Sequence, residues 1–170
     1  MMNKYLSFCA VVFALVLTGC GAKPYVDVTS KDYATLQLVP KSETLIFTDD
    51  YYAFLYKHTK GCKNDVELGI VTTDSDTPSR IIKIPVNEPL QINLNYRIES
   101  GNSTYIEYAN FLLSAEKNRH YVFEYTRKDM GLFKETLSEF DAYIMENGKM
   151  IRIDPKRIRN FDPTKECVND

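Results

Sequence analysis

The stretch from Leu90 to Ile98 most constrains the fold of this chain, because its side chains alternate strictly between apolar and polar. The apolar positions are Leu90, Ile92, Leu94, Tyr96 and Ile98. A strand with this pattern has one buried and one solvated face, as in an antiparallel sheet. Sliding the strand by one residue would bury its polar side chains, so the register is strongly specified. The pattern predicts a strand that covers a core on one side.

Similar runs recur along the chain with turn residues between them. They lie at 34–39, 44–48, 51–56, 66–70, 82–86, 105–113 and 121–127. Pro85 cannot donate to a ladder, so its strand is expected at a sheet edge. Asn147-Gly148 is a strong hairpin signal, and it would place Glu146 opposite Lys149. About eight to ten short strands predict an all-β fold, an antiparallel β-sandwich or a flattened barrel.

The segment from Leu132 to Ala142 is ambiguous between helix and strand. Phe133, Leu137 and Phe140 have helical spacing, and Lys134 and its charged neighbours favour a short helix. We therefore expect at most one short helix in the domain.

The N-terminal stretch is patterned differently. Lys4 precedes an apolar run from Leu6 to Leu17, and this run of 12 residues is shorter than the roughly 20 needed to span a bilayer. A cation followed by a short apolar run and small residues is typical of a secretory signal. The run closes on Leu17-Thr18-Gly19-Cys20.

Leu17-Thr18-Gly19-Cys20 resembles the lipobox of bacterial lipoproteins. The resemblance implies cleavage between Gly19 and Cys20, a diacylglyceryl group on the Cys20 sulfur and an acyl chain such as palmitate on the new amino group. Position 21 is glycine rather than aspartate. By similarity to enterobacterial lipoproteins, this implies the periplasmic leaflet of the outer membrane, with the inner membrane as the alternative.

These features predict three parts: a signal peptide at 1–19 that is removed, a lipidated cysteine with a tether at 20–32, and a β-sandwich domain at 33–170. The mature 151 residues (170 − 19) are enough for one core. Only Lys4 among the charges is lost, which leaves 20 basic against 23 acidic residues. This balance gives no reason to expect nucleic acid as a partner.

Two cysteines, Cys62 and Cys167, remain in the predicted mature domain. In an oxidising compartment a single pair predicts a disulfide. His58 lies near Cys62, but no CxxC or HxxxH spacing supplies a ligand set, so we expect no metal site.

The sequence carries no motif of a hydrolase, metalloprotease or phosphate-binding loop, and its histidines are His58 and His120. The close carboxylate groupings are Asp49-Asp50 and Asp74-x-Asp76, and the polar, proline-containing run from Asp74 to Ser79 is typical of a turn. We expect no enzymatic activity and no cofactor.

Two groups of residues are candidate contact surfaces. The basic cluster could contact an anionic partner or lipid, or could be a solvated edge that opposes aggregation; it comprises Lys149, Arg152, Lys156, Arg157 and Arg159. The tyrosines could form an interaction face or could fill strands; they are Tyr51, Tyr52, Tyr56, Tyr105, Tyr108, Tyr121 and Tyr125. The absence of tryptophan weakens a sugar-stacking role for them without excluding it.

Beyond the lipobox, the mature chain resembles small gammaproteobacterial lipoproteins with an all-β domain. The matching features are Ala34-Thr35-Leu36, the position of Cys62, the strand near Leu90 and the segment from Phe111 to Tyr121. We expect a lipid-anchored, periplasm-facing binding or scaffolding protein. The alternatives are a lipoprotein component of a secretion or envelope assembly and an inhibitor of a cell-wall hydrolase.

Overall fold

The computed structural model describes residues 22–42, 48–59, 62, 65–74, 77–100, 103–128, 137–153 and 158–167. Gly19, Cys20, Lys156 and Arg157 lie outside these ranges, as do the predicted run at 44–48 up to position 47 and the segment 132–136. Within the described ranges, no helical segment has the length and hydropathy of a membrane span.

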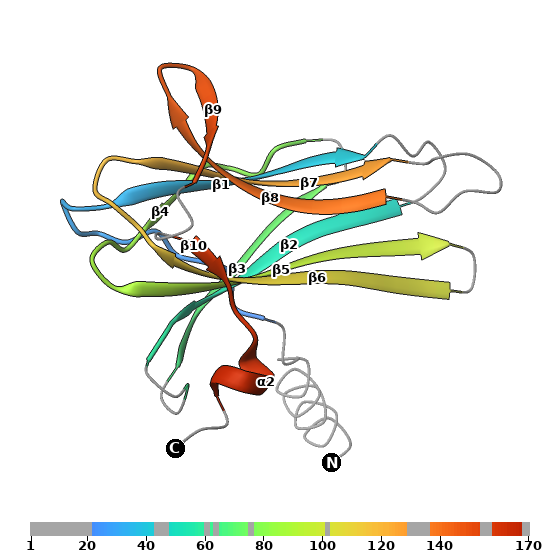
Figure 1. Ribbon diagram of the computed structural model, residues 1–170, viewed down its shortest axis with the longest axis horizontal. Helices are drawn as coiled ribbons and strands as arrows, with labels where there is room; N and C mark the ends of the chain where they lie inside the picture. The colour runs from blue at the N-terminus through green and yellow to red at the C-terminus, as the bar shows by residue number, and fades with distance from the viewer. Residues whose placement is uncertain are drawn as a thin grey trace, which may run out of the picture.

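The described strands form two sheets. They are β1 (Ala34–Ser42), β2 (Thr48–Lys57), β3 (Val66–Asp74), β4 (Ile82–Ile84), β5 (Pro89–Ser100), β6 (Ser103–Ser114), β7 (His120–Lys128), β8 (Leu137–Glu146), β9 (Lys149–Arg152) and β10 (Ile158–Asn160). The first sheet has the order β4-β1-β7-β8-β9, and the second has the order β10-β6-β5-β2-β3. Figure 1 shows them as two stacked layers, so the predicted β-sandwich is confirmed.

One strand pair departs from the antiparallel prediction. β1 runs parallel to β7, from Thr35 opposite His120 to Ser42 opposite Arg127. All other named strand pairs are antiparallel. β4 pairs only with β1 among the described strands, which agrees with the edge position predicted from Pro85.

The core lies between the sheets and follows the predicted alternation. The strand expected at 90–98 is β5, and its apolar side chains point inward with at most 4% exposure. Opposite it, the first sheet contributes Leu36, Leu38 and Phe123, all fully buried. Full burial of such a side chain stabilises the fold by about 1.5–3 kcal/mol. The rings of Tyr96 and Tyr125 stack at 3.8 Å across the two sheets.

β8 decides the segment that is ambiguous between helix and strand: its described part is a strand and not the short helix that the spacing favours. Residues 137–142 are part of a strand that pairs along β7, with Tyr121 opposite Ile144 and Tyr125 opposite Phe140. Ala142 is buried, and Phe140 and Ile144 pack against the core, so the period is two. The helical spacing was misleading because pairing with β7 outweighs local helix propensity. The short helix is instead α2 (Pro163–Glu166), whose N-cap Asp162 accepts a bond from Thr164 N.

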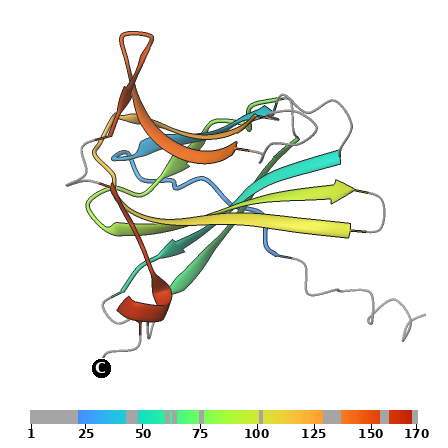
Figure 2. The same cartoon turned by 45° about the vertical axis from the view of Figure 1, so that its right-hand side comes forward.

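The hairpin predicted at Asn147-Gly148 joins β8 and β9. Both turn residues have positive φ, 51° and 76°, as a type I′ turn requires. Glu146 lies opposite Lys149 in the ladder, as expected. The hairpin projects beyond the first sheet, as Figures 1 and 2 show.

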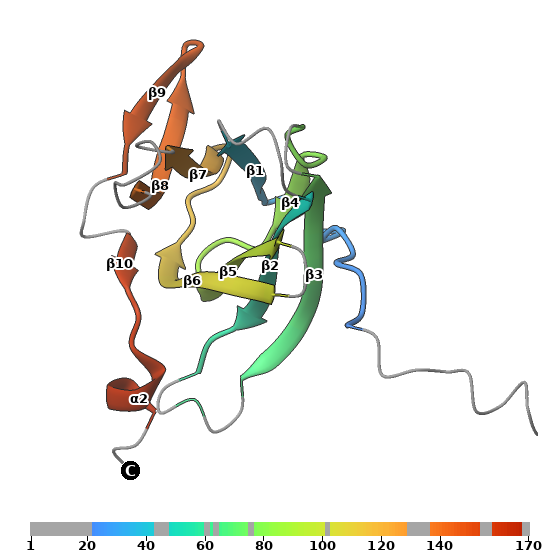
Figure 3. The same cartoon turned by 90° about the vertical axis from the view of Figure 1, so that its right-hand side faces the viewer.

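The segment expected as a tether is partly docked on the domain. Ile70 N donates to Lys23 O at 2.8 Å, and Tyr25 N donates to Ile70 O at 2.9 Å. The Tyr25 ring is buried, and its hydroxyl donates to Lys83 O. Figure 3 shows this blue segment lying along β3. The folded unit therefore includes residues from Lys23 onward, ahead of the expected boundary at 33.

Candidate functional site

The predicted disulfide between Cys62 and Cys167 is present, with the two Cα atoms 5.2 Å apart. It joins the β2–β3 connection to the residue that follows α2. Phe161 precedes α2, is 3% exposed and donates its backbone N–H to Asn110 O. The C-terminal segment is thus fixed at one end of the second sheet, on the side away from the first sheet (Figure 1).

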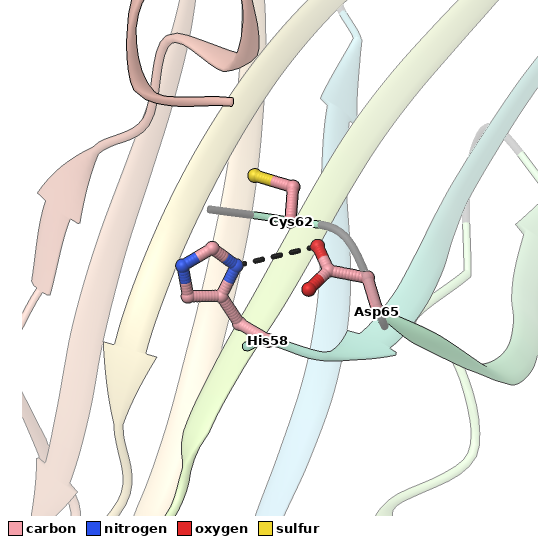
Figure 4. A group of neighbouring side chains, drawn as sticks. All are labelled: His58, Cys62 and Asp65. Carbon is pink, nitrogen blue, oxygen red and sulfur yellow. Dashed lines mark hydrogen bonds and ion pairs between the residues drawn. The ribbon is translucent and has the colours of Figure 1, made fainter. Parts of the chain in front are cut away.

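His58 and Asp65 lie beside Cys62, one of the two cysteines of this disulfide (Figure 4). Asp65 accepts a bond from Thr59 N at 2.6 Å and lies 3.3 Å from His58 Nδ1. Potential ligand atoms of His58, Cys62 and Asp65 fall within 4.8 Å of one another. However, the Cys62 sulfur is bonded to Cys167 and is not a thiolate in this state. The Thr59–Asp65 hydrogen bond ties the two ends of the β2–β3 loop together. Of the three residues in the group, His58 and Asp65 are the two that could still coordinate a metal ion.

The second histidine lies in the other sheet. His120 begins β7, and its Nδ1 lies 2.9 Å from Thr35 Oγ1. Burial lowers the pKa of His120 below its usual value. His120 is therefore part of the β1–β7 pair in the first sheet, and it does not lie beside His58.

The described members of the basic cluster are largely ion-paired. Arg152 binds Asp141, and Arg159 binds Glu166 at 2.5 Å. Both arginines line a groove of about 410 Å³ between the edges of the two sheets. Lys149 lies on the exposed hairpin. Because Arg152 and Arg159 already have carboxylate partners, these two arginines offer less free positive charge than the sequence suggests.

The fold divides the predicted tyrosine group. Tyr51, Tyr121 and Tyr125 are fully buried, and burial raises the pKa of the Tyr51 phenol well above its usual value. The Tyr125 hydroxyl donates to Glu107 Oε2 at 2.7 Å. The structural interpretation is therefore correct for these three tyrosines. Four others are partly or largely exposed: Tyr52, Tyr56, Tyr105 and Tyr108.

Tyr52 and Tyr108 belong to two cross-strand rows of polar and apolar residues on the outer side of the second sheet. The first row is Thr72, Tyr52, Asn95 and Tyr108, and the second is Ile70, Phe54, Asn93 and Asn110. We call these eight residues the amide–aromatic face. None of them carries a charge. The wet side of an exposed sheet usually carries charged residues, so an uncharged face of this size is a candidate contact surface.

The amides of this face are held in a defined arrangement. Gln91 Nε2 donates to Asn93 Oδ1 at 2.9 Å, and Asn95 Nδ2 donates to the Asn93 carbonyl at 3.1 Å. Gln91 is 7% exposed, and its Oε1 has no hydrogen-bond partner among the described residues. Leaving a buried acceptor unpaired costs roughly 1–3 kcal/mol. The Gln91 amide thus orients Asn93 while its own carbonyl oxygen stays unpaired among the described residues.

The aromatic rings of the face are also positioned by neighbours. The Tyr52 and Phe54 rings meet edge to face, with centroids 5.7 Å apart and planes at 87°. Tyr108 is 72% exposed. Asp50 pairs with Arg97 across β2 and β5 in the next row, so charge begins only at the margin of the face. A hollow of about 450 Å³ lies over this margin and is lined by residues that include Asp50, Tyr52, Phe54, Ile70, Thr72 and Arg97.

The sequence contained a signal for this face that the tyrosine grouping missed. The polar positions of the strand at 90–98 are amides at Gln91, Asn93 and Asn95, where charged residues are more usual. Alternation shows that these three amides share one side, but only the strand order brings Tyr52 and Tyr108 to either side of Asn95.

Comparison of this chain with protein-family models, with curated proteins and with solved structures finds no match.

Proposed function

We propose that this chain is a lipid-anchored, non-catalytic binding or scaffolding protein of the bacterial envelope, and that the amide–aromatic face is its contact surface. The observation that carries the proposal is the pair of uncharged rows on the outer side of the second sheet, in which Thr72 and Tyr108 are exposed and the other six residues are half-buried. A solvated sheet face needs no such composition, whereas tyrosines are favoured at protein contact surfaces. The proposed location is the periplasmic leaflet of the outer membrane.

The anchor is supported by Leu17-Thr18-Gly19-Cys20. Two or more acyl chains on Cys20 would hold the protein stably, because one chain alone binds membranes only marginally. The docked segment begins at Lys23, three residues after Cys20, and three residues span at most about 11 Å. A lipid on Cys20 would therefore keep the folded domain close to the bilayer.

The anchor is tested by Cys20→Ala, with Cys9→Ala as the matched control in the same apolar run. We expect Cys20→Ala to accumulate as precursor without radiolabelled palmitate, and Cys9→Ala to be processed and labelled normally. Fractionation of the labelled protein distinguishes the outer from the inner membrane. Normal labelling of Cys20→Ala would refute the anchor.

The contact surface is tested in cells with a photoreactive phenylalanine analogue at position 108 or at position 105. Both positions are tyrosines on β6 with high exposure, 72% and 60%, but they lie on opposite sides of the strand. We expect a discrete crosslinked product from position 108 and none from position 105. Equal crosslinking from both positions would remove the basis for assigning the contact to this face.

The identity of the product separates the alternatives. A membrane-protein partner would favour a role in a secretion or envelope assembly. A captured cell-wall hydrolase, together with loss of its activity, would favour an inhibitor.

A further inference from the structure

We infer that the amide–aromatic face binds a neutral oligosaccharide with acetamido groups, laid across strands β2, β5 and β6. The inference rests on the proposed function, because it names the ligand of the same face. Three properties of the face carry it: the spacing of its rings, the free atoms of its amides and its lack of charge.

Two rings of the face form separate stacking platforms. Tyr52 and Tyr108 lie in one row on either side of Asn95. Adjacent strands are about 4.7–4.9 Å apart, so the two tyrosines are separated by roughly 9.5 Å across the sheet. Each ring offers an apolar surface to the C–H face of a pyranose, and tyrosine gives such area at low cost in conformational entropy. Phe54 supports the Tyr52 ring by its edge-to-face contact.

The amides between these platforms retain one donor and one acceptor. Asn93 uses its Oδ1 to accept from Gln91, and Asn95 uses its Nδ2 to donate to the Asn93 carbonyl. Among the described residues, Asn93 Nδ2 and Asn95 Oδ1 have no protein partner. The two residues are neighbours on one side of β5. An acetamido group carries one carbonyl acceptor and one N–H donor, so it complements this pair of atoms.

The lack of charge narrows the ligand class. Binding of nucleic acid or phosphate depends on lysine and arginine contacts, and the eight residues of the face include neither. A dry protein interface that covered these half-buried amides would have to satisfy their hydrogen bonds or lose free energy. A glycan offers hydroxyl and amide groups beside apolar C–H surface, which matches alternating amides and rings. The Asp50–Arg97 row limits the neutral area at one end.

The test is calorimetric titration of the full lipoprotein in detergent with chitotetraose, which carries acetamido groups, and with cellotetraose, which does not. We expect chitotetraose to bind at least tenfold more tightly than cellotetraose. Tyr108→Ala should weaken chitotetraose binding at least tenfold, whereas Tyr108→Phe should retain it because the ring is the contact. The matched control Tyr105→Ala should change binding less than twofold.

The acetamido contact is tested separately with Asn95→Leu, which keeps the side-chain size and removes the acceptor. We expect this variant to bind chitotetraose no better than cellotetraose. Equal binding of the two glycans by the wild type would overturn the acetamido assignment. Absence of binding to either glycan, or equal losses in Tyr105→Ala and Tyr108→Ala, would overturn the inference.

The crosslinking experiment separates failure of this inference from failure of the proposed function. If the apparent mass of the position-108 product falls on digestion with a glycan hydrolase, the result supports a glycan as the ligand. A discrete protein product, with no glycan binding in calorimetry, would leave the contact surface in place and refute its ligand. Loss of both signals would refute the two proposals together.

Discussion

Replacing both disulfide cysteines, Cys62→Ser with Cys167→Ser, should destabilise the domain mainly through its denatured state. The bond joins positions 105 residues apart, so it closes a large loop in the unfolded chain. The chain-entropy model gives about 4.7 kcal/mol for a loop of this size at 25 °C, as an upper figure. The ladder between β10 and β6 remains in the variant, and the core between the two sheets contains neither cysteine, so we expect the sandwich to stay assembled.

The assay is equilibrium urea unfolding of wild-type and variant protein, followed by circular dichroism. We expect the free energy of unfolding to fall by about 3–5 kcal/mol, which corresponds to roughly 6–20 °C in Tm. The m value should rise, because the uncrosslinked denatured chain exposes more surface. Wild-type protein reduced with a dithiol should match the variant, which controls for effects of serine itself.

A loss below about 1 kcal/mol with an unchanged m value would refute this reasoning. It would mean that the denatured chain is already as compact without the bond as with it. Two alkylatable thiols in the untreated protein, measured by mass spectrometry, would contradict the bond itself.

Three further outcomes test the packing. Leu94→Ala should cost about 2–5 kcal/mol in the free energy of unfolding, because Leu94 is fully buried; a cost under 1 kcal/mol would contradict that packing. Gly69→Ala should detach the docked segment and make it sensitive to protease, since a Cβ at position 69 would lie 2.7 Å from a backbone atom of that segment. The control Gly148→Ala, whose Cβ would have nothing within 4 Å, should leave the docked segment resistant to protease. Tyr51 and Tyr125 are buried as neutral phenols, and burial raises their pKa values. Their contribution to the free energy of unfolding should be fully present below about pH 10 and should be lost above it, because these tyrosines ionise more readily in the unfolded chain. A rise in phenolate absorbance well before unfolding would contradict this.

Much of the fold could be predicted because its strands alternate cleanly. β5 follows the pattern from Leu90 to Ile98, and the buried side of β7 carries Tyr121, Phe123 and Tyr125 as expected. The hairpin at 147–148 was predictable because positive φ at two adjacent positions selects Asn-Gly. In each case the determining interactions lie within a few residues.

Predictions failed where distant partners decide the outcome. β8 has helical spacing in sequence, but its partner β7 imposes a strand. The docking of Lys23 and Tyr25 depends on the space that Gly69 leaves on β3, which no local pattern indicates. The register between β2 and β3 shifts between Leu55 and Tyr56 of β2, so a simple period of two misplaces the faces of β3. The amide–aromatic face likewise depends on strand order, because its rows cross four strands.

The parallel pairing of β1 with β7 has a consequence for how the chain matures. Thr35 and His120 are 85 positions apart, so β1 emerges long before the strand that covers its edge. β5 and β6 are adjacent in sequence and can pair before β7 is available. Until β7 pairs with β1, the side chains of Leu36 and Leu38, which are buried in the finished fold, lack part of their cover. Contacts this distant in sequence form slowly and leave intermediates prone to aggregate. We therefore expect folding of this protein to require that β1 is shielded until β7 can pair with it.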